Sequence, residues 1–278
     1  MTTARKPAAG AAAPTRIDAT FAACRARGEA ALVTYVMGGD PDLATSRAMA
    51  LACVEGGADL LEIGMPFSDP IADGPTIQLA AERALAKGTT VADCLELAAS
   101  VRARADVPIA MMGYVNPVLS YGEVRFLDDC AKAGVDAVIL PDLPPEEAAD
   151  FGRLARERGV ATVFLLAPTS TAARRSAACA SASGFLYFVS VTGVTGARRE
   201  LPADLGERLR ELRGESPVPV VVGFGVSTPA QAKALAGLAD GVVVGSAIVS
   251  RIAEGGSRTA RADRVRRFVR SLKRAVRP

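Results

Sequence analysis

Residues 58–86 read ADLLEIGMPFSDPIADGPTIQLAAERALA, and this stretch contains the smallest repeating unit of the fold. The apolar run Ala58–Gly64 predicts a buried strand, because near-continuous apolar residues are typical of strands covered on both faces. Met65–Pro75 is too rich in proline and glycine for a helix, so we expect a loop there. Apolar residues at helical spacing return in Ile77–Ala86. The stretch is therefore one strand–loop–helix unit.

The same unit recurs along the chain. Eight apolar runs predict strands: Ala31–Val36, Leu60–Gly64, Pro108–Tyr114, Ala137–Leu140, Thr162–Ala167, Phe185–Ser190, Pro219–Gly223 and Gly241–Gly245. Segments with helical spacing or high helix propensity separate them, among them Leu43–Glu55, Ile77–Ala86, Val91–Ala105, Glu146–Arg158, Thr171–Ala180, Ala203–Leu212 and Pro229–Leu235. Eight such units in about 250 residues predict an α/β fold, a (β/α)8 TIM barrel. We also expect a short N-terminal helix before the first strand.

An open, doubly wound sheet is the alternative architecture, but no G-x-G-x-x-G motif follows the first predicted strand. We expect residues 16–278 to form a single catalytic barrel domain. Residues 1–15 are rich in alanine and contain neither acidic nor aromatic residues, which predicts a disordered tail. An organellar targeting peptide is the other interpretation of this tail, although such peptides are usually longer and richer in serine.

Composition argues against several classes of protein. The net charge of the 278-residue chain is only +3, which does not suit a dedicated nucleic-acid-binding protein. No apolar run reaches about 18 residues, so we expect no membrane span. Five widely spaced cysteines lie in alanine-rich helical patterns and indicate reduced core thiols of a cytoplasmic protein.

The absence of histidine and the scarcity of lysine argue against several kinds of catalytic site. The chain has no histidine, which argues against a metal site and against Ser–His catalysis. Lysine occurs at five positions, none of them at the carboxyl end of a predicted strand. A Schiff-base mechanism, which needs a desolvated lysine in the site, therefore has no good candidate.

Two acidic residues lie where the second predicted strand ends. Glu62 is near the carboxyl end of the strand, and Asp73 follows in the loop. Active sites of (β/α)8 barrels lie at this end of the strands. Burial there raises a carboxyl pKa toward the range useful for proton transfer, so we interpret the pair as an acid–base site. The alternative is that Glu62 is a satisfied strand-end acid and that Asp69 and Asp73 are turn residues.

Two glycine-rich motifs follow the last two predicted strands. Gly223–Pro229 ends the seventh strand and opens a helix, while Gly245-Ser246-Ala247 ends the eighth. Barrels commonly bind phosphate in these loops through backbone N–H groups and a helix N-terminus, so we expect a phosphorylated substrate. Tight turns would account for either motif alone. A third segment with glycines, residues 190–200, suits a mobile lid that excludes water, or else a plain surface loop.

The end of the chain is strongly basic. Residues 251–278 contain ten arginines or lysines and two acids. Five apolar residues share one helical face, with the arginines on the other: Val265, Phe268, Val269, Leu272 and Val276. We interpret this segment as the eighth barrel helix with a solvated basic face, rather than as a nucleic-acid or membrane-binding element.

Several sequence strings together identify a family. The most specific is PFSDPIADGP at Pro66–Pro75, directly after Glu62-Ile63-Gly64. The others span most of the chain: MGGDP at Met37–Pro41, MGY at Met112–Tyr114 with Asn116-Pro117, PDLP at Pro141–Pro144, GVTG at Gly193–Gly196, GFG at Gly223–Gly225 and GSAIV at Gly245–Val249. With these strings the chain resembles the alpha subunit of tryptophan synthase, the indole-3-glycerol-phosphate lyase family. The resemblance implies a barrel that cleaves indole-3-glycerol phosphate to indole and glyceraldehyde 3-phosphate in tryptophan biosynthesis.

The resemblance also implies roles for single residues in this retro-aldol reaction. Glu62 would move the proton between indole C3 and the side-chain hydroxyl, and Asp73 would accept the indole N–H and stabilise the developing positive charge. The implied substrate contacts are Tyr187, Met112, Phe224, Ile139, Val243 and Thr195, although the four apolar ones are equally compatible with core positions. The implied phosphate contacts are Gly196, Gly225, Gly245 and Ser246. Thr195 would also close the lid against Asp69.

By the same resemblance the chain would hold no cofactor and no metal. It would pair with a beta subunit that carries pyridoxal phosphate, in an alpha2beta2 heterotetramer. Asp142 and Pro144 would lie at this interface, because their loop follows a strand, as the loop Pro66–Pro75 does. Tyr35 departs from the family, which often has a plain apolar aromatic residue there, so we expect its hydroxyl to contact the substrate or a water.

Three other functions stay open at this stage. A free-standing indole-3-glycerol phosphate lyase would release indole without an obligate partner. A catalytically idle, regulatory barrel would be expected to have lost one carboxylate, and both are present here. A sugar-phosphate isomerase on a similar barrel is a weaker alternative, because the string Ala72-Asp73-Gly74-Pro75 argues against it.

Overall fold

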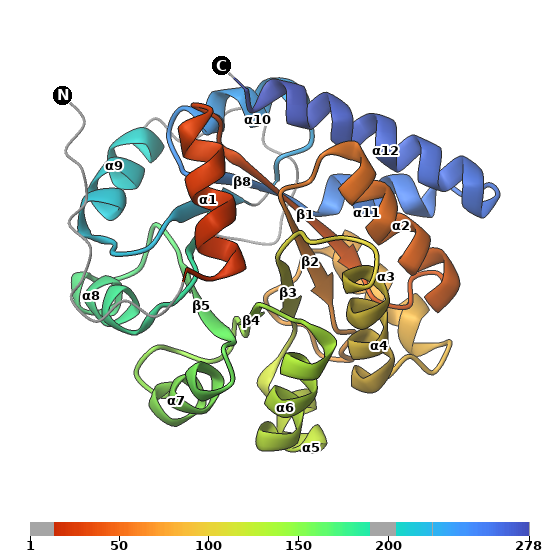
Figure 1. Cartoon of the computed structure of the whole chain (residues 1–278), viewed down its shortest axis with the longest axis horizontal. Coiled ribbons are helices and arrows are strands. Elements are labelled where there is room, and N and C mark those ends of the chain that lie inside the picture. Colours follow the sequence, from red (N-terminus) through yellow and green to blue (C-terminus); the bar gives the residue numbers. More distant parts are fainter. Residues whose placement is uncertain (1–13, 190–203, 224, 278) are drawn as a thin grey trace.

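The computed structural model describes residues 14–189, 204–223 and 225–277 (Figure 1). Within these residues eight parallel strands pair in chain order, and β8 pairs with β1 to close a barrel. The strands are β1 Ala31–Met37, β2 Leu60–Gly64, β3 Ile109–Met112, β4 Ala137–Ile139, β5 Ala161–Leu166, β6 Leu186–Val189, β7 Val220–Gly223 and β8 Gly241–Val244. The predicted α/β class and the (β/α)8 barrel are confirmed.

Twelve helices lie in the part of the chain that the structure describes. They are α1 Arg16–Ala26, α2 Leu43–Gly56, α3 Pro75–Leu85, α4 Val91–Arg102, α5 Val115–Tyr121, α6 Glu123–Ala133, α7 Ala149–Glu157, α8 Ala172–Ser181, α9 Leu205–Glu215, α10 Pro229–Ala236, α11 Ser246–Ala253 and α12 Arg258–Ala275. The expected short helix before the first strand is α1, which begins at a capping box of Thr15 and Asp18. The predicted tail, residues 1–15, lies almost wholly outside the described residues and stays a prediction.

The helix predictions differ from the structure in three places, and one of them is α11, Ser246–Ala253, a helix that was not predicted. α5 and α6 are not among the helices expected from the sequence, because Pro117 and Gly122 interrupt the helical pattern there. Pro117 is tolerated because it lies in the first turn of α5, where a backbone N–H has no partner within the helix. The helix predicted from Glu146 begins only at Ala149, since Pro144 to Ala148 form hydrogen-bonded turns.

α1 closes the amino-terminal end of the barrel. The inward-facing side chains of the strands are small or branched: Ala31, Val33, Leu60, Ala110, Ala137, Ile139, Ala161, Val163, Val221 and Val243. Ile17 and Phe21 of α1 pack against this cluster, and the ring centroid of Phe21 lies 6.0 Å from that of Phe185. Figure 1 shows α1 lying across this end of the barrel. The open end of the barrel is therefore the carboxyl end of the strands.

A set of side-chain acceptors joins neighbouring strands at the closed end of the barrel. Asp59, Asp136 and Asp240, here called the aspartate ring, each directly precede an even-numbered strand. Each accepts a backbone N–H from the preceding strand at 2.8 Å: Leu32 to Asp59, Ile109 to Asp136 and Val220 to Asp240. Each also pairs with a basic residue of a covering helix: Lys273, Arg102 and Arg213, respectively. The ring therefore fixes both strand register and helix position.

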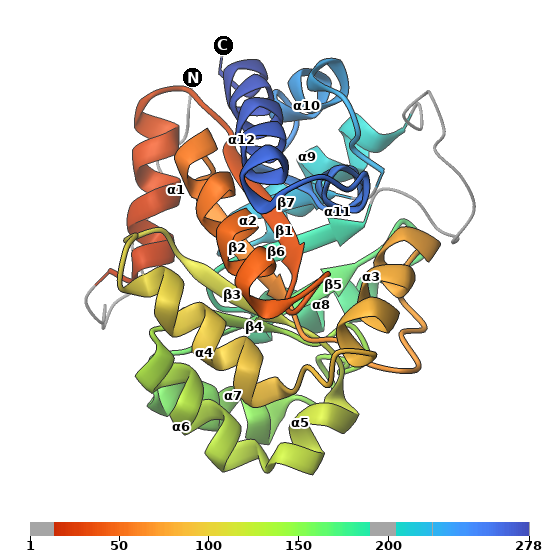
Figure 2. The ribbon, with the colours of Figure 1, turned by 90° about the vertical axis from the view of Figure 1, so that its right-hand side faces the viewer.

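α12 packs beside α2 on the outside of the barrel (Figures 1 and 2). The five apolar residues predicted for its inner face are buried. Lys273 is the exception to the predicted basic face, because it is only 7% exposed and pairs with Glu29 and Asp59. Neither α12 nor any other helix among the described residues is long and apolar enough to cross a membrane. The eighth barrel helix is thus as expected, apart from this lysine.

The five cysteines occupy core positions. All are free and buried: Cys24, Cys53, Cys94, Cys130 and Cys179. Burial raises the pKa of the Cys53 thiol to about 12, so this thiol stays neutral. The prediction of reduced core thiols is confirmed.

Candidate active site

Glu62 is a buried acid inside the barrel. It points inward from β2, in register with Tyr35 on β1 and Ala110 on β3, and is 1% exposed. Its Oε1 atom has no hydrogen-bond partner among the described residues. Burial raises its pKa from 4.5 to about 8, the direction expected from its position. Glu62 is therefore mostly protonated at neutral pH, and within the described part of the chain its Oε1 atom has no partner.

Asp73 ends the loop between β2 and α3. Burial raises its pKa to about 6, while a hydrogen bond that Tyr114 donates to Oδ2 at 3.1 Å opposes the shift. The same hydroxyl accepts the N–H of Ala72 at 3.0 Å. Asp73 also lies two residues before Pro75, the first residue of α3, where the helix dipole favours negative charge. Asp73 is therefore mostly ionised at neutral pH, while Glu62 is not.

Two inward-facing tyrosines, Tyr35 on β1 and Tyr187 on β6, bracket the two acids. Each leans toward the open end over a glycine of the next strand: a Cβ at Gly64 would lie 2.0 Å from the Tyr35 hydroxyl, and one at Gly223 would lie 2.5 Å from that of Tyr187. Burial is the largest cause of the raised pKa of both phenols. The second largest cause is the negative charge of Asp73 for Tyr35 and that of Glu62 for Tyr187. Both acids and both hydroxyls therefore face one space.

The apolar residues predicted to contact the substrate differ in how deeply they are buried in the barrel. Ile139 and Val243 lie in the buried inner cluster, whereas Met112, the last residue of β3, is partly exposed. Leu165 and Val189 are likewise partly exposed against the same cluster and were not predicted as contacts. Their positions near the carboxyl ends of β5 and β6 are the sequence feature that could have identified them as contacts. Among the described residues, Met112, Leu165 and Val189 are thus the partly exposed apolar side chains that pack on this cluster, and Met112 is the one that was predicted from the sequence.

The predicted phosphate contacts lie at the ends of β7 and β8. Gly225 is exposed and has a φ of +80°, and apart from its chain neighbours no described residue lies within 4 Å of where its Cβ would be. Gly245 directly precedes α11, and no side chain caps that helix. Ser246, its first residue, is exposed. By contrast Thr228 and Gln231 form a capping box on α10. α11 therefore begins with backbone N–H groups that no side chain caps.

Three predicted residues lie outside the described residues: Thr195, Gly196 and Phe224. The lid and its latch therefore stay predictions, together with one apolar contact. Asp69, the expected partner of Thr195, is exposed and accepts a hydrogen bond from Ser68.

Asp142 and Pro144, the predicted interface residues, lie beside the site. Asp142 is exposed, and both its oxygens lie 3.1 Å from the N–H of Val115, the first residue of α5. Its charge also contributes to the raised pKa of Tyr114. The β4–α7 loop thus contacts the β3–α5 loop that positions Tyr114. Pro144 is partly exposed and accepts the N–H of Glu147.

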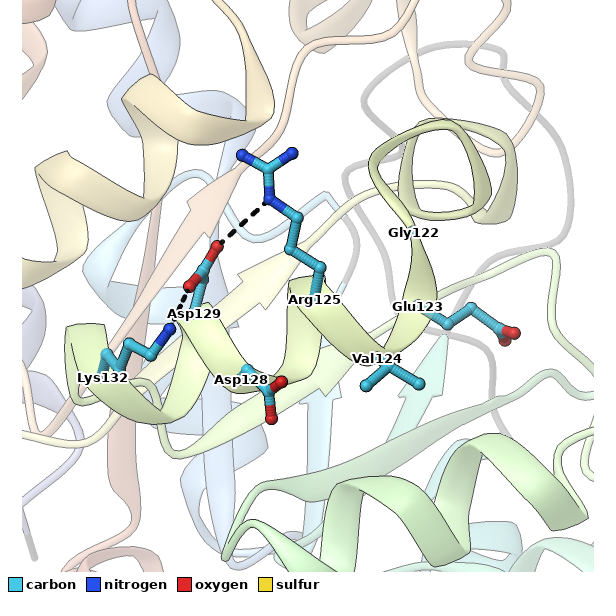
Figure 3. A pocket seen from close by; sticks show the side chains of 7 residues that line it. All are labelled: Gly122, Glu123, Val124, Arg125, Asp128, Asp129 and Lys132. Carbon is cyan, nitrogen blue, oxygen red and sulfur yellow. Dashed lines mark hydrogen bonds and ion pairs between the residues drawn. The ribbon is translucent and has the colours of Figure 1, made fainter.

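A second concave area lies away from the barrel axis, on α6 (Figure 3). Arg125 and Lys132 both point toward Asp129 there and pair with it at 3.8 and 2.9 Å. The depression is open, and its two basic side chains both pair with Asp129. In the described part of the chain, no cluster of His, Cys, Asp or Glu side chains is arranged to hold a metal ion.

The structure is a (β/α)8 barrel with a protonated and an ionised carboxyl near the carboxyl end of its strands, the arrangement expected of an acid–base enzyme of this fold. Known proteins agree. The model of the family "Tryptophan synthase alpha chain" matches residues 21–277. The tryptophan synthase alpha chain of Geobacter sulfurreducens is 50% identical over 261 residues, covering 94% of this chain and 98% of its own. That of Citrifermentans bemidjiense is 54% identical over 234 residues, covering 84% and 88%.

Solved structures show the same likeness. A chain of Mycobacterium tuberculosis tryptophan synthase matches with a TM-score of 0.88 at 40% identity, covering 95% of this chain and 99% of that one. The alpha subunit from Legionella pneumophila matches with a TM-score of 0.85 at 35% identity, covering 94% and 98%. The chain therefore belongs to the tryptophan synthase alpha chain family. It is a lyase of tryptophan biosynthesis that cleaves indole-3-glycerol phosphate, and the free-standing and idle alternatives are not favoured.

Proposed function

We propose that Glu62 and Asp73 divide the cleavage of indole-3-glycerol phosphate between them. The observation that carries this assignment is the unpartnered Oε1 of a buried, protonated Glu62 in a space that also faces Asp73. An unsatisfied buried carboxyl is costly in the free protein, and a substrate can supply the missing partner.

Glu62 acts first as an acid and then as a base. Its carboxyl proton is transferred to indole C3, which makes the ring a cation. The resulting carboxylate then removes the proton of the hydroxyl on the adjacent side-chain carbon. The O–H electrons form the carbonyl of glyceraldehyde 3-phosphate, and the electrons of the broken carbon–carbon bond return to the indole ring. Glu62 is protonated again at the end of the cycle, so no further reactant is needed.

Asp73 stabilises the cation between these two proton transfers. Its pKa of about 6 leaves it ionised at neutral pH, so it can accept the indole N–H as a charge-assisted hydrogen bond. The Tyr114 hydroxyl bond fixes the orientation of the carboxylate before substrate arrives. A preorganised charge of this kind needs little rearrangement when the ring becomes positive.

The phosphate is assigned to the carboxyl ends of β7 and β8. The uncapped N-terminus of α11 at Gly245 and Ser246, and the open space over Gly225, support this assignment. Gly196 and Thr195 are proposed to complete the site from the segment after β6, and Phe224 to cover the indole ring. Tyr187, Met112, Ile139 and Val243 are proposed to line the rest of the substrate pocket.

A tryptophan synthase beta chain is the proposed partner, because the relatives are named as alpha chains and as tryptophan synthase structures. We assign an alpha2beta2 complex with pyridoxal phosphate held by the beta chain, and no cofactor in this one. Ile71, on the catalytic loop, is 81% exposed, and Leu119 of α5 is 53% exposed. With Asp142 and Pro144, these residues form the proposed docking face. The free, buried thiols suit a cytoplasmic location.

The pH dependence of indole release tests the division of labour. We expect kcat/KM to rise through a pKa of about 6, where Asp73 ionises, and to fall through about 8, where Glu62 loses its proton. Asp73→Asn should lower kcat/KM by about 10²-fold and remove the acid limb, because an amide has no charge to offset the cation. A variant that keeps both its rate and its acid limb would show that Asp73 has another role.

A further inference from the structure

The hydroxyl of Tyr35 is a buried group with a poor partner. Tyr35 is 6% exposed, and its hydroxyl donates to the thioether sulfur of Met37 across 3.8 Å. Thioether sulfur is a weak acceptor, so most of the hydrogen-bonding capacity of this donor is unused. Burial of a polar group without a good partner is costly unless a ligand completes it.

The position of Tyr35 identifies which part of a ligand the hydroxyl would meet. Its side chain stands beside Glu62 in the strand register and reaches over Gly64 toward the open end. On its other side Gly245 is so close that a Cβ there would lie 3.4 Å from the Tyr35 Cβ. Tyr35 therefore lies between the acid pair, which is assigned to the indole ring and the reacting carbon, and Gly245, which is assigned to the phosphate.

The groups around the hydroxyl keep it a donor. Tyr35 packs against Met37, against Ile77 of α3 and against Val249 of α11, all apolar. The charged groups that face it are Glu62 and Asp73, with the Tyr114 hydroxyl and the Cys94 thiol further contributors to its raised pKa. A phenol held neutral keeps its proton, and so it can donate a hydrogen bond to a ligand oxygen.

We propose that Tyr35 is a further substrate-binding residue, whose hydroxyl donates a hydrogen bond to an oxygen of the hydroxylated chain that links the indole ring to the phosphate. This assignment rests on the proposed function. It makes Tyr35 a determinant of specificity for a polyol linker over an alkyl linker, since an alkyl chain leaves the donor without a partner. Gly64 is then required because any side chain there would occupy the place of the hydroxyl.

The test compares two ligands in one variant. Tyr35→Phe removes the hydroxyl and keeps the ring. We expect kcat/KM for indole-3-glycerol phosphate to fall about 3- to 10-fold, the loss of one neutral hydrogen bond. The inhibition constant of indole-3-propanol phosphate, which has the same ring and phosphate but no hydroxyl on the linker, should change by less than about 2-fold. Tyr121→Phe is the matched control, because that hydroxyl bonds Asp129 at the surface and should affect neither constant.

Two results would overturn the proposal. One is an unchanged kcat/KM in Tyr35→Phe. The other is an equal loss of kcat/KM and of affinity for indole-3-propanol phosphate, which would mean that only packing of the ring matters. The parent protein separates this failure from that of the proposed function. A parent that releases no indole contradicts the roles of Glu62 and Asp73 themselves. A parent that releases indole, alongside a Tyr35→Phe variant that behaves like it, contradicts only the contact made by Tyr35.

Discussion

The hydroxyl of Tyr114 donates a hydrogen bond to Asp73 Oδ2 at 3.1 Å while it accepts the N–H of Ala72 at 3.0 Å. One side chain that follows β3 therefore holds both the proposed catalytic carboxylate and the backbone before it. Tyr114→Phe should lower kcat/KM by about 10-fold, because Asp73 loses a donor and its loop loses an anchor. Steady-state indole release measures this effect.

The same variant makes a prediction about pH. The Tyr114 bond lowers the Asp73 pKa against the effect of burial, so its loss should move the acid limb of the kcat/KM profile above pH 6. A lower rate with an unmoved acid limb would show that Tyr114 acts only on loop position. Tyr121→Phe serves again as a control for loss of a tyrosine hydroxyl outside the site.

The aspartate ring is expected to govern stability and not rate. Asp136 accepts the N–H of Ile109 and pairs with Arg102 at 2.7 Å, and both side chains of the pair are mostly buried. Asp136→Asn should cost about 2–3 kcal/mol of unfolding free energy, because a largely buried arginine loses its counter-charge. Urea unfolding measures the loss, and kcat should stay within about 2-fold. Stability like that of the parent would mean that the ring is dispensable.

The docking face can be tested at Ile71. An isoleucine that is 81% exposed on a catalytic loop is explained by a partner that covers it. Ile71→Asp should weaken binding of a tryptophan synthase beta chain at least 10-fold, because a charge would be buried at the interface. Titration calorimetry measures this affinity. Leu85→Asp, at the far end of α3, is the control with a similar change on an exposed leucine.

Asp142 needs a pair of variants, because it also accepts the N–H of Val115. Asp142→Asn keeps an acceptor for α5 and removes the charge, whereas Asp142→Ala removes both. If the charge docks the partner, both variants bind the beta chain more weakly and Asp142→Asn keeps the isolated rate within about 3-fold. Equal affinity of parent and both variants would place the interface elsewhere.

The titration of Glu62 should also appear in the stability of the protein. Its pKa is 4.5 when unperturbed and about 8 in the folded chain, so folding favours the protonated form. The contribution to stability is complete below about pH 4.5 and is lost as the pH rises through about 8. The thermal midpoint of the parent should therefore fall more steeply between about pH 4.5 and 8 than that of Glu62→Gln. Parallel curves would mean that Glu62 is already ionised in the folded protein.

The sequence was sufficient for the barrel and for the two acids, because both depend on local patterns. A buried strand ending near Glu62 and a proline-rich loop containing Asp73 can be recognised from neighbouring residues alone. The contacts between distant segments could not be predicted in this way. Tyr114 lies 41 residues from Asp73 in the chain, and only the pairing of β2 with β3 brings their loops together.

The same reason accounts for the missed role of Lys273. Its neighbours in the sequence indicate a solvated basic face, but the packing of α12 on α2 places it between Glu29 and Asp59, more than 200 residues away. Ile71 was not singled out for the proposed docking face from the sequence, because one exposed isoleucine in a loop has no sequence pattern. The aspartate ring likewise depends on strand register, which the pattern of each strand does not specify alone.

The most direct test of the account is the rate of indole release from indole-3-glycerol phosphate by the parent and by Glu62→Gln, each with and without a beta chain. Glutamine keeps the size of the side chain and removes its ability to carry the proton. The account predicts a parent that releases indole and a variant that is folded, with an equal circular dichroism spectrum, but slower by about 10²-fold or more in both conditions. A folded Glu62→Gln variant that releases indole at close to the parental rate would contradict it.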